Sequence, residues 1–240
     1  MFSNRMALNR RKKDDGEKPF WISFSDLMTA LMMLFLVTMS VALLAVTKNV
    51  SESERKRAVR EQDIVKLLNR VENAAKKYGV TVDRSRNVID FRDRARFETN
   101  SHKLTPEQAK LLRAFVSQVV LPVARDELGK RWLKRLVVEG FADQRGSYLL
   151  NLNLSMQRSQ RVLCVLLAKP FPEEQAMEAS ELEQIRELFL VGGYSFNSAK
   201  KSLDASRRIE LRLEFFLVDE KPPPTEVIPR GDFGLCALES

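Results

Sequence analysis

The sequence predicts a single N-terminal transmembrane α-helix followed by an α/β domain, a βαβαβ sandwich in which helices cover one face of a mixed sheet. The helix is predicted by residues 20–46, an apolar run with one ionisable group. At about 1.5 Å rise per residue, this run exceeds the roughly 30 Å thickness of the hydrocarbon core. The domain is predicted by residues 80–218, where strand-like apolar patterns alternate with helical ones.

The apolar run is expected to stay in the mature protein as a single-pass anchor in the bacterial inner membrane. A cleaved signal peptide has a shorter apolar core, of about 7–15 residues, and ends in small residues. Residues 1–19 form a polar tail whose basic run, at residues 10–13, directly precedes the span. The positive-inside rule therefore places this tail in the cytoplasm and the C-terminal domain in the periplasm.

Two further segments flank the domain. Residues 47–79 are predicted to form a helical linker that ends at Gly79. Its one short apolar stripe suits packing against a partner helix or a neighbouring domain, and consists of Ile64, Leu67, Leu68, Val71 and Ala75. Residues 219–240 contain three consecutive prolines and are expected to form an extended, irregular tail.

Local signals place the elements of the domain. Residues 81–91 are predicted to form a hairpin-like strand region. Thr105 and Pro106 suit the N-cap and the first turn of a helix. The remaining predicted elements are a buried strand at 136–141, helices at 147–168 and 173–188, and strands at 188–191 and 208–215.

Charge and cysteine content exclude several classes of function. The net charge of +8 is spread along the chain, which disfavours direct nucleic-acid binding. Cys164 and Cys236 lack metal-binding spacing, so no metal or cofactor is predicted. In a periplasmic domain they could form a disulfide, and two unpaired thiols are the equally open alternative. The single histidine, His102, lies in a polar segment without a nucleophile, so no catalytic residues and no enzyme are predicted.

Asp26 is the one ionisable residue of the predicted span. An aspartate within a transmembrane helix costs about 2.5–3.5 kcal/mol, and protonation removes most of that cost. Asp26 is therefore a candidate proton carrier, and the alternative is a carboxylate that reaches the cytoplasmic interface. A supporting helix face is formed by Ser23, Thr29, Ala30 and Met33. One helix offers no polar partner across the hydrocarbon, so a multi-span partner subunit is implied.

Residues 20–30, with the sequence FWISFSDLMTA, resemble the W-x-S-F-[AS]-D-[ML]-M-T motif of the MotB family, the ion-carrying stator subunits of the flagellar motor. In that family the aspartate accepts the proton, and Asp26 is the matching position. The resemblance implies a homodimer that works with a multi-span channel partner.

A second resemblance covers most of residues 80–218. Residues 138–158 are similar to the OmpA-like peptidoglycan-binding signature G-x-[TA]-D-x-x-G…N-x-x-L-S-x-x-R. The two diaminopimelate-binding positions of that family match Asp143 and Arg158, and residues 204–211 resemble its closing strand motif. A carboxylate suits the ammonium of diaminopimelate, and a guanidinium suits its carboxylates. The peptidoglycan-binding residues expected on this basis are Asp143, Asn151, Leu154, Arg158 and Arg208.

A MotB-type span followed by an OmpA-like domain is typical of stator subunits. The short linker and the span are more similar to stator subunits of the Zorya anti-phage systems than to flagellar MotB. This resemblance implies a channel partner in five copies around a dimer of this chain. The OmpA-like resemblance implies a stem peptide of peptidoglycan as ligand. A flagellar stator subunit and a passive OmpA-like wall tether are the alternatives, and whether residues 47–79 plug the channel stays open.

Overall fold

The computed structural model describes residues 18–170, 174, 176–220 and 233–238. It divides into two compact units, Met1–Lys56 and Arg57–Ser240. Most of the expected cytoplasmic tail and most of the expected C-terminal tail, including its prolines, lie outside the described residues. Each unit is considered below by itself.

Helix α1 (Lys18–Ala75) is 58 residues long and contains the expected span. No glycine or proline interrupts it between residues 20 and 75, so every backbone N–H in its interior keeps an i−4 carbonyl partner. Among the described residues, this is the one helix long and apolar enough to cross a membrane. A short 3₁₀ turn, η1 (Lys76–Tyr78), follows, and Gly79 ends it with a φ of +69°, a conformation that glycine adopts without strain.

The C-terminal unit alternates strands and helices in the expected order. The strands are β1 (Thr81–Asp83), β2 (Val88–Asp90), β3 (Leu133–Gly140), β4 (Phe189–Gly193) and β5 (Ile209–Phe215). Between them lie η2 (Arg92–Ala95), α2 (Pro106–Phe115), η3 (Val116–Val120), α3 (Leu121–Arg125), α4 (Glu127–Trp132), α5 (Tyr148–Leu167), α6 (Ala179–Leu188) and α7 (Leu203–Ser206).

Helix starts follow their capping residues. Thr105 forms a capping box with Gln108 at the start of α2, as its sequence predicts. Ser147 caps α5 through the backbone N–H of Leu150. Helix α6 starts at Ala179, where Glu178 provides a capping box, and the expected helix start at residue 173 lies outside the described residues.

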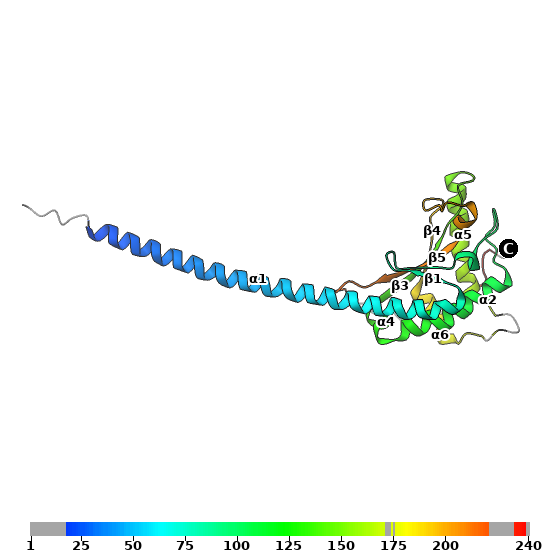
Figure 1. Cartoon of the computed structure of the whole chain (residues 1–240), viewed down its shortest axis with the longest axis horizontal. Helices are drawn as coiled ribbons and strands as arrows, with labels where there is room; N and C mark the ends of the chain where they lie inside the picture. The colour runs from blue at the N-terminus through cyan, green and yellow to red at the C-terminus, as the bar shows by residue number, and fades with distance from the viewer. Residues whose placement is uncertain (1–17, 171–173, 175, 221–232, 239–240) are drawn as a thin grey trace, which may run out of the picture. The chain divides into compact units, whose positions relative to one another are not determined.

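The five strands form one mixed sheet in the order β1-β2-β5-β3-β4. Strand β5 pairs antiparallel with both β2 and β3, whereas β4 pairs parallel with β3. Helices α2, α4 and α6 lie on one side of the sheet (Figure 1). The predicted fold class, a long N-terminal apolar helix and a mixed α/β domain, is confirmed.

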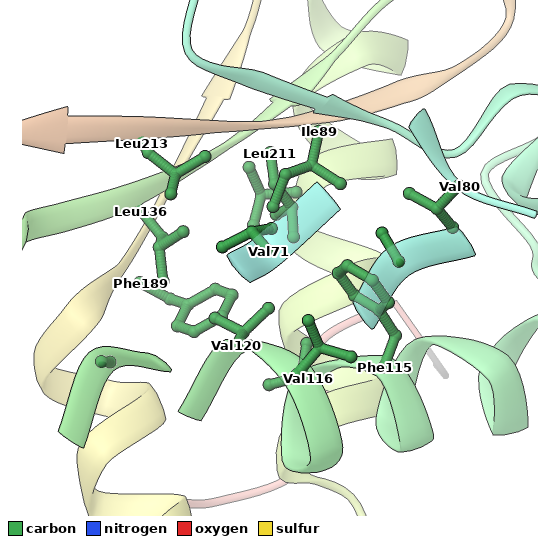
Figure 2. Packing of buried hydrophobic residues seen from close by; sticks show 14 of the residues in the cluster. Val71, Val80, Ile89, Phe115, Val116, Val120, Leu136, Phe189, Leu211 and Leu213 are labelled. Atoms are coloured by element: carbon green, nitrogen blue, oxygen red, sulfur yellow. The ribbon is translucent and has the colours of Figure 1, made fainter. Parts of the chain in front are cut away.

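The core lies between this side of the sheet and the helices. Leu136, Leu211 and Leu213 of the strands face Val116 and Val120 of the helical layer (Figure 2). The apolar stripe of α1, from Ile64 to Ala75, is part of the same core. The compact unit that begins at Arg57 therefore includes the second half of the expected linker, because the domain covers the stripe.

Candidate functional site

Asp26 lies in the first unit, on the apolar part of α1. Helical spacing places Ser23, Ala30 and Met33 on the same face. The hydroxyl of Thr29 donates to the backbone carbonyl of Ser25 (2.7 Å), so its hydrogen is used within the helix. Side chains from residue 21 to residue 59 are exposed in the isolated chain. Within a membrane, a polar partner for Asp26 from outside its own helix would therefore have to come from another chain.

The C-terminal unit contains a pocket of about 260 Å³ beside the start of α5. Four of the five residues expected to bind peptidoglycan line it: Asp143, Asn151, Leu154 and Arg158. The other lining residues are Thr99, Asn100, Arg145, Gly146 and Leu150. The pocket thus combines one carboxylate, two guanidinium groups, amides and apolar side chains.

The loop between β3 and α5 positions Asp143. The backbone N–H of Ala142 donates to the carbonyl of Ser195 (2.8 Å), which fixes the start of the loop. The side-chain amide of Asn151 donates to the carbonyl of Arg145 (2.8 Å), which fixes its end against α5. Gly146 has a φ of +92°, where a residue with a Cβ would be strained.

Two glycines bring α5 close to the sheet. A Cβ atom on Gly140 would lie 2.0 Å from the backbone oxygen of Ser155. A Cβ atom on Gly193 would lie 2.7 Å from the backbone nitrogen of Met156. This close approach places the Asn151–Arg158 face of α5 directly beside the loop that carries Asp143.

Arg158 is fully buried behind the pocket. Its Nη1 donates to the carbonyl of Phe141 (2.8 Å), Nε to that of Ser101 (3.0 Å) and Nη2 to that of Glu98 (3.1 Å). These bonds use three of the five N–H groups of the guanidinium. Burial lowers the pKa of Arg158 to about 10, so the group remains charged at neutral pH. Arg158 therefore ties the loop at residues 98–101 to the end of β3 as well as lining the pocket.

Asp143 is the anionic centre of the pocket and is itself buried. Its carboxylate accepts hydrogen bonds from Arg145 and from Arg207. The hydrogen bond from Arg145 has the largest effect on the pKa of Asp143. Together these bonds lower that pKa to about 2, although burial of the carboxylate raises it. The carboxylate is therefore ionised throughout the neutral range and suited to holding a cation.

Arg208, the fifth residue expected to bind peptidoglycan, is not among the residues that line the pocket. Its Nε donates to Glu210 (2.7 Å), and its guanidinium carbon lies 4.0 Å from the centre of the Phe141 ring. The neighbouring Arg207 reaches the site instead and donates to Asp143 (3.2 Å). Consecutive residues entering a strand point to opposite faces, so the choice between the two arginines depends on the strand register.

Sequence reasoning missed the contributions of Thr99, Asn100 and Arg145 to the pocket. The loop at residues 98–101 lies far from α5 in the sequence, and no spacing rule connects them. A usable signal existed for Arg145, because it stands two residues after the key aspartate in a tight loop that ends in glycine.

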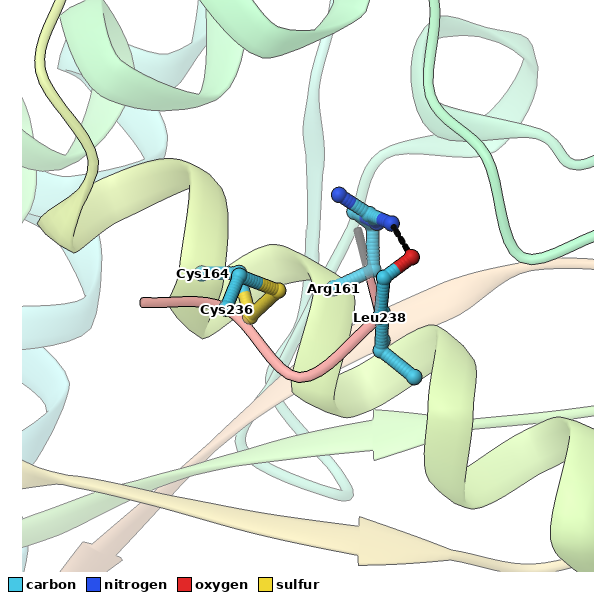
Figure 3. Close-up of a disulfide and its surroundings, with 4 residues drawn as sticks. All are labelled: Arg161, Cys164, Cys236 and Leu238. Carbon is cyan, nitrogen blue, oxygen red and sulfur yellow. Dashed lines mark hydrogen bonds between the residues drawn. A yellow bond between two sulfur atoms is a disulfide. The ribbon is translucent and has the colours of Figure 1, made fainter. Parts of the chain in front are cut away.

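The structure joins Cys164 of α5 to Cys236 by a disulfide, with their Cα atoms 5.5 Å apart. The sequence left this pairing and two free thiols equally open. Arg161, one turn earlier on α5, donates to the carbonyl of Leu238 (2.7 Å), so the described part of the tail is held at two points (Figure 3).

Comparisons with known proteins agree with the resemblances to the MotB family and to the stator subunits of Zorya systems. Residues 8–54 match the family described as the membrane protein MotB of the proton-channel complex MotA/MotB. Over 230 residues, the chain is 46% identical to the Zorya protein ZorB of Escherichia coli O139:H28, and the match covers 95% of this chain and 93% of that one.

Two solved structures are similar at lower identity. A putative MotB-like protein from Desulfovibrio vulgaris is 18% identical, with a TM-score of 0.45 over 67% of this chain and 99% of that one. The periplasmic domain of a MotB is 14% identical, with a TM-score of 0.39 over 55% of this chain and 65% of that one.

Proposed function

We propose that this chain, which belongs to the ZorB family of MotB-like stator subunits, carries protons on Asp26 while its C-terminal domain holds it to peptidoglycan. On this proposal it is a fixed subunit of an inner-membrane motor in an anti-phage Zorya system. Its N-terminus lies in the cytoplasm, its C-terminal domain lies in the periplasm, and it works as a dimer. The channel partner is a multi-span, ZorA-like protein, expected in five copies.

The observation that carries the proposal is the position of Asp26 in an apolar helix whose surroundings match the MotB family. A carboxylate there alternates between an ionised form, which needs polar surroundings, and a neutral form, which tolerates hydrocarbon. Each proton that crosses the membrane releases about 2.3 kcal/mol per 100 mV. That energy is available for movement of the channel subunits against a subunit held by the cell wall.

Asp26→Asn tests proton carriage, because an amide keeps the size of the side chain but does not bind and release a proton near neutral pH. The variant should assemble with its partner, and proton flux into vesicles that contain the purified complex should fall to background. Ser40→Ala is the matched control, since its hydroxyl only donates to the carbonyl of Leu36 within the helix. Full flux through the assembled Asp26→Asn complex would refute proton carriage and favour a passive wall tether.

The pocket supports the wall attachment. Asp143 offers an ionised carboxylate to an ammonium group, and Arg158 offers the remaining N–H groups of its guanidinium to a carboxylate. A diaminopimelate-containing stem peptide carries both kinds of group. The test is a pull-down of the full chain with purified peptidoglycan, in which Asp143→Asn should bind more weakly than the unmodified chain. Equal binding of a folded Asp143→Asn variant would refute this role of the pocket.

A further inference from the structure

We propose that Arg145 is an internal competitor of the ligand: its side chain occupies the carboxylate of Asp143 and has to leave before an ammonium group can bind there. The inference rests on the proposed function, in which the pocket takes a stem peptide. On this inference, Arg145 lowers the affinity of the pocket for its ligand. An arginine that lines a peptide site would ordinarily be expected to raise that affinity.

The hydrogen-bonding capacity of Asp143 is fully used within the chain. Oδ1 accepts from the backbone N–H of Arg145 (3.0 Å) and from its Nε (3.3 Å). Oδ2 accepts from Nη2 of Arg145 (2.7 Å) and from Nη1 of Arg207 (3.2 Å). Two carboxylate oxygens offer about four acceptor sites, and all four have donors here. An incoming ammonium group can therefore bind Asp143 only in place of one of them.

The side chain of Arg145 is the donor that can leave. Its side chain is 52% exposed, whereas that of Arg207 is 9% exposed. Arg207 also donates to the carbonyl of Phe97 (2.9 Å) and pairs with Asp204, so it is held from three sides. An ion pair with an exposed partner contributes little free energy, because water solvates the released group.

Arg145 also reaches across the pocket. Its Nη2 donates to the hydroxyl of Thr99 (3.1 Å), and both Thr99 and Asp143 line the pocket. The guanidinium thus lies between two lining residues, where a ligand would have to pass. When the side chain leaves, the backbone N–H of Arg145 still donates to Oδ1, and Arg207 still donates to Oδ2. Asp143 then keeps its orientation and gains one free acceptor site on each oxygen.

Arg145→Ala in the full chain, purified in detergent, tests the inference by calorimetric titration with a soluble tripeptide of alanine, glutamate and diaminopimelate. The dissociation constant should fall by about fivefold, the upper range for loss of a partly exposed ion pair. Arg135→Ala is the matched control, because Arg135 is also a half-exposed arginine paired with a carboxylate, that of Glu214, away from the pocket. It corrects for the loss of one positive charge and should leave the affinity unchanged.

A second ligand separates competition from other effects. The same tripeptide with both its N-terminal amine and its diaminopimelate side-chain amine acetylated has no ammonium group to offer Asp143, so Arg145→Ala should bring no gain with it. A gain that persists with the acetylated peptide would overturn the inference.

Unchanged or weaker binding of the unmodified tripeptide to a folded Arg145→Ala variant would also overturn it, and weaker binding would assign Arg145 to the ligand itself. The proposed function would survive either result, as long as the unmodified chain binds the tripeptide. If neither protein binds the tripeptide or peptidoglycan, the wall-binding proposal fails and the inference fails with it.

Discussion

Replacing Arg158 by alanine is expected to destabilise the C-terminal domain and also to weaken peptidoglycan binding in the pocket. If Arg158 only bound the ligand, the variant would bind less peptidoglycan and stay folded. The structure differs because Arg158 donates to three backbone carbonyls, those of Glu98, Ser101 and Phe141. Alanine would remove this donor from all three, although the carbonyl of Glu98 would still accept from the backbone N–H of Ser101 (3.2 Å).

The size of the effect follows from where these carbonyls lie. The bond to Phe141 is buried, so its loss carries the full cost of an unsatisfied buried acceptor, about 1–3 kcal/mol. The bonds to Ser101 and Glu98 are only partly buried, so water entering through the pocket restores part of their loss. Alanine also removes the cost of burying a guanidinium. The net loss in the free energy of unfolding should be about 3 kcal/mol.

The assay is urea unfolding of the full chain in detergent, followed by tryptophan fluorescence. Trp132 is buried in the domain and its indole N–H donates to Asp63 (3.1 Å), so it reports unfolding of this unit. Arg158→Lys keeps a charge and three donors but not the planar fork, and should lose less than Arg158→Ala. A loss below about 0.5 kcal/mol in Arg158→Ala would refute the structural role of this arginine.

Two further predictions concern stability. Asp143 has a pKa of about 2 in the folded chain, below its unfolded value of 3.8, so its contribution is present above pH 4 and is lost as the pH falls through 2. The free energy of unfolding of Asp143→Asn should therefore be about 1–2 kcal/mol below that of the unmodified chain at pH 6, and the difference should vanish near pH 2. A difference independent of pH would contradict an ionised, hydrogen-bonded Asp143. Cys236→Ser opens a loop with a sequence separation of 72 and should cost about 2–4 kcal/mol in urea unfolding. Reducing agent should cause the same loss in the unmodified chain, and no loss in either case would contradict the link between Cys164 and the tail.

The sequence by itself determined the features that depend on local order. The span, the position of Asp26 within it and the capped starts of α2 and α5 follow from composition and from residues a few positions apart. The shared face of Asn151, Leu154 and Arg158 follows from helical spacing alone, and all three line the pocket.

Only the tertiary structure decided which groups meet across large sequence separations. It brought Arg207 rather than Arg208 to Asp143, placed three backbone carbonyls around Arg158 and put the stripe of α1 into the core of its own domain. Spacing rules describe one helix or one strand at a time, whereas these contacts depend on strand register and on how closely α5 approaches the sheet. The same limit applies to Arg145. Its position two residues after Asp143 is visible in the sequence, but its hydrogen bonds to the Asp143 carboxylate depend on the conformation of the loop.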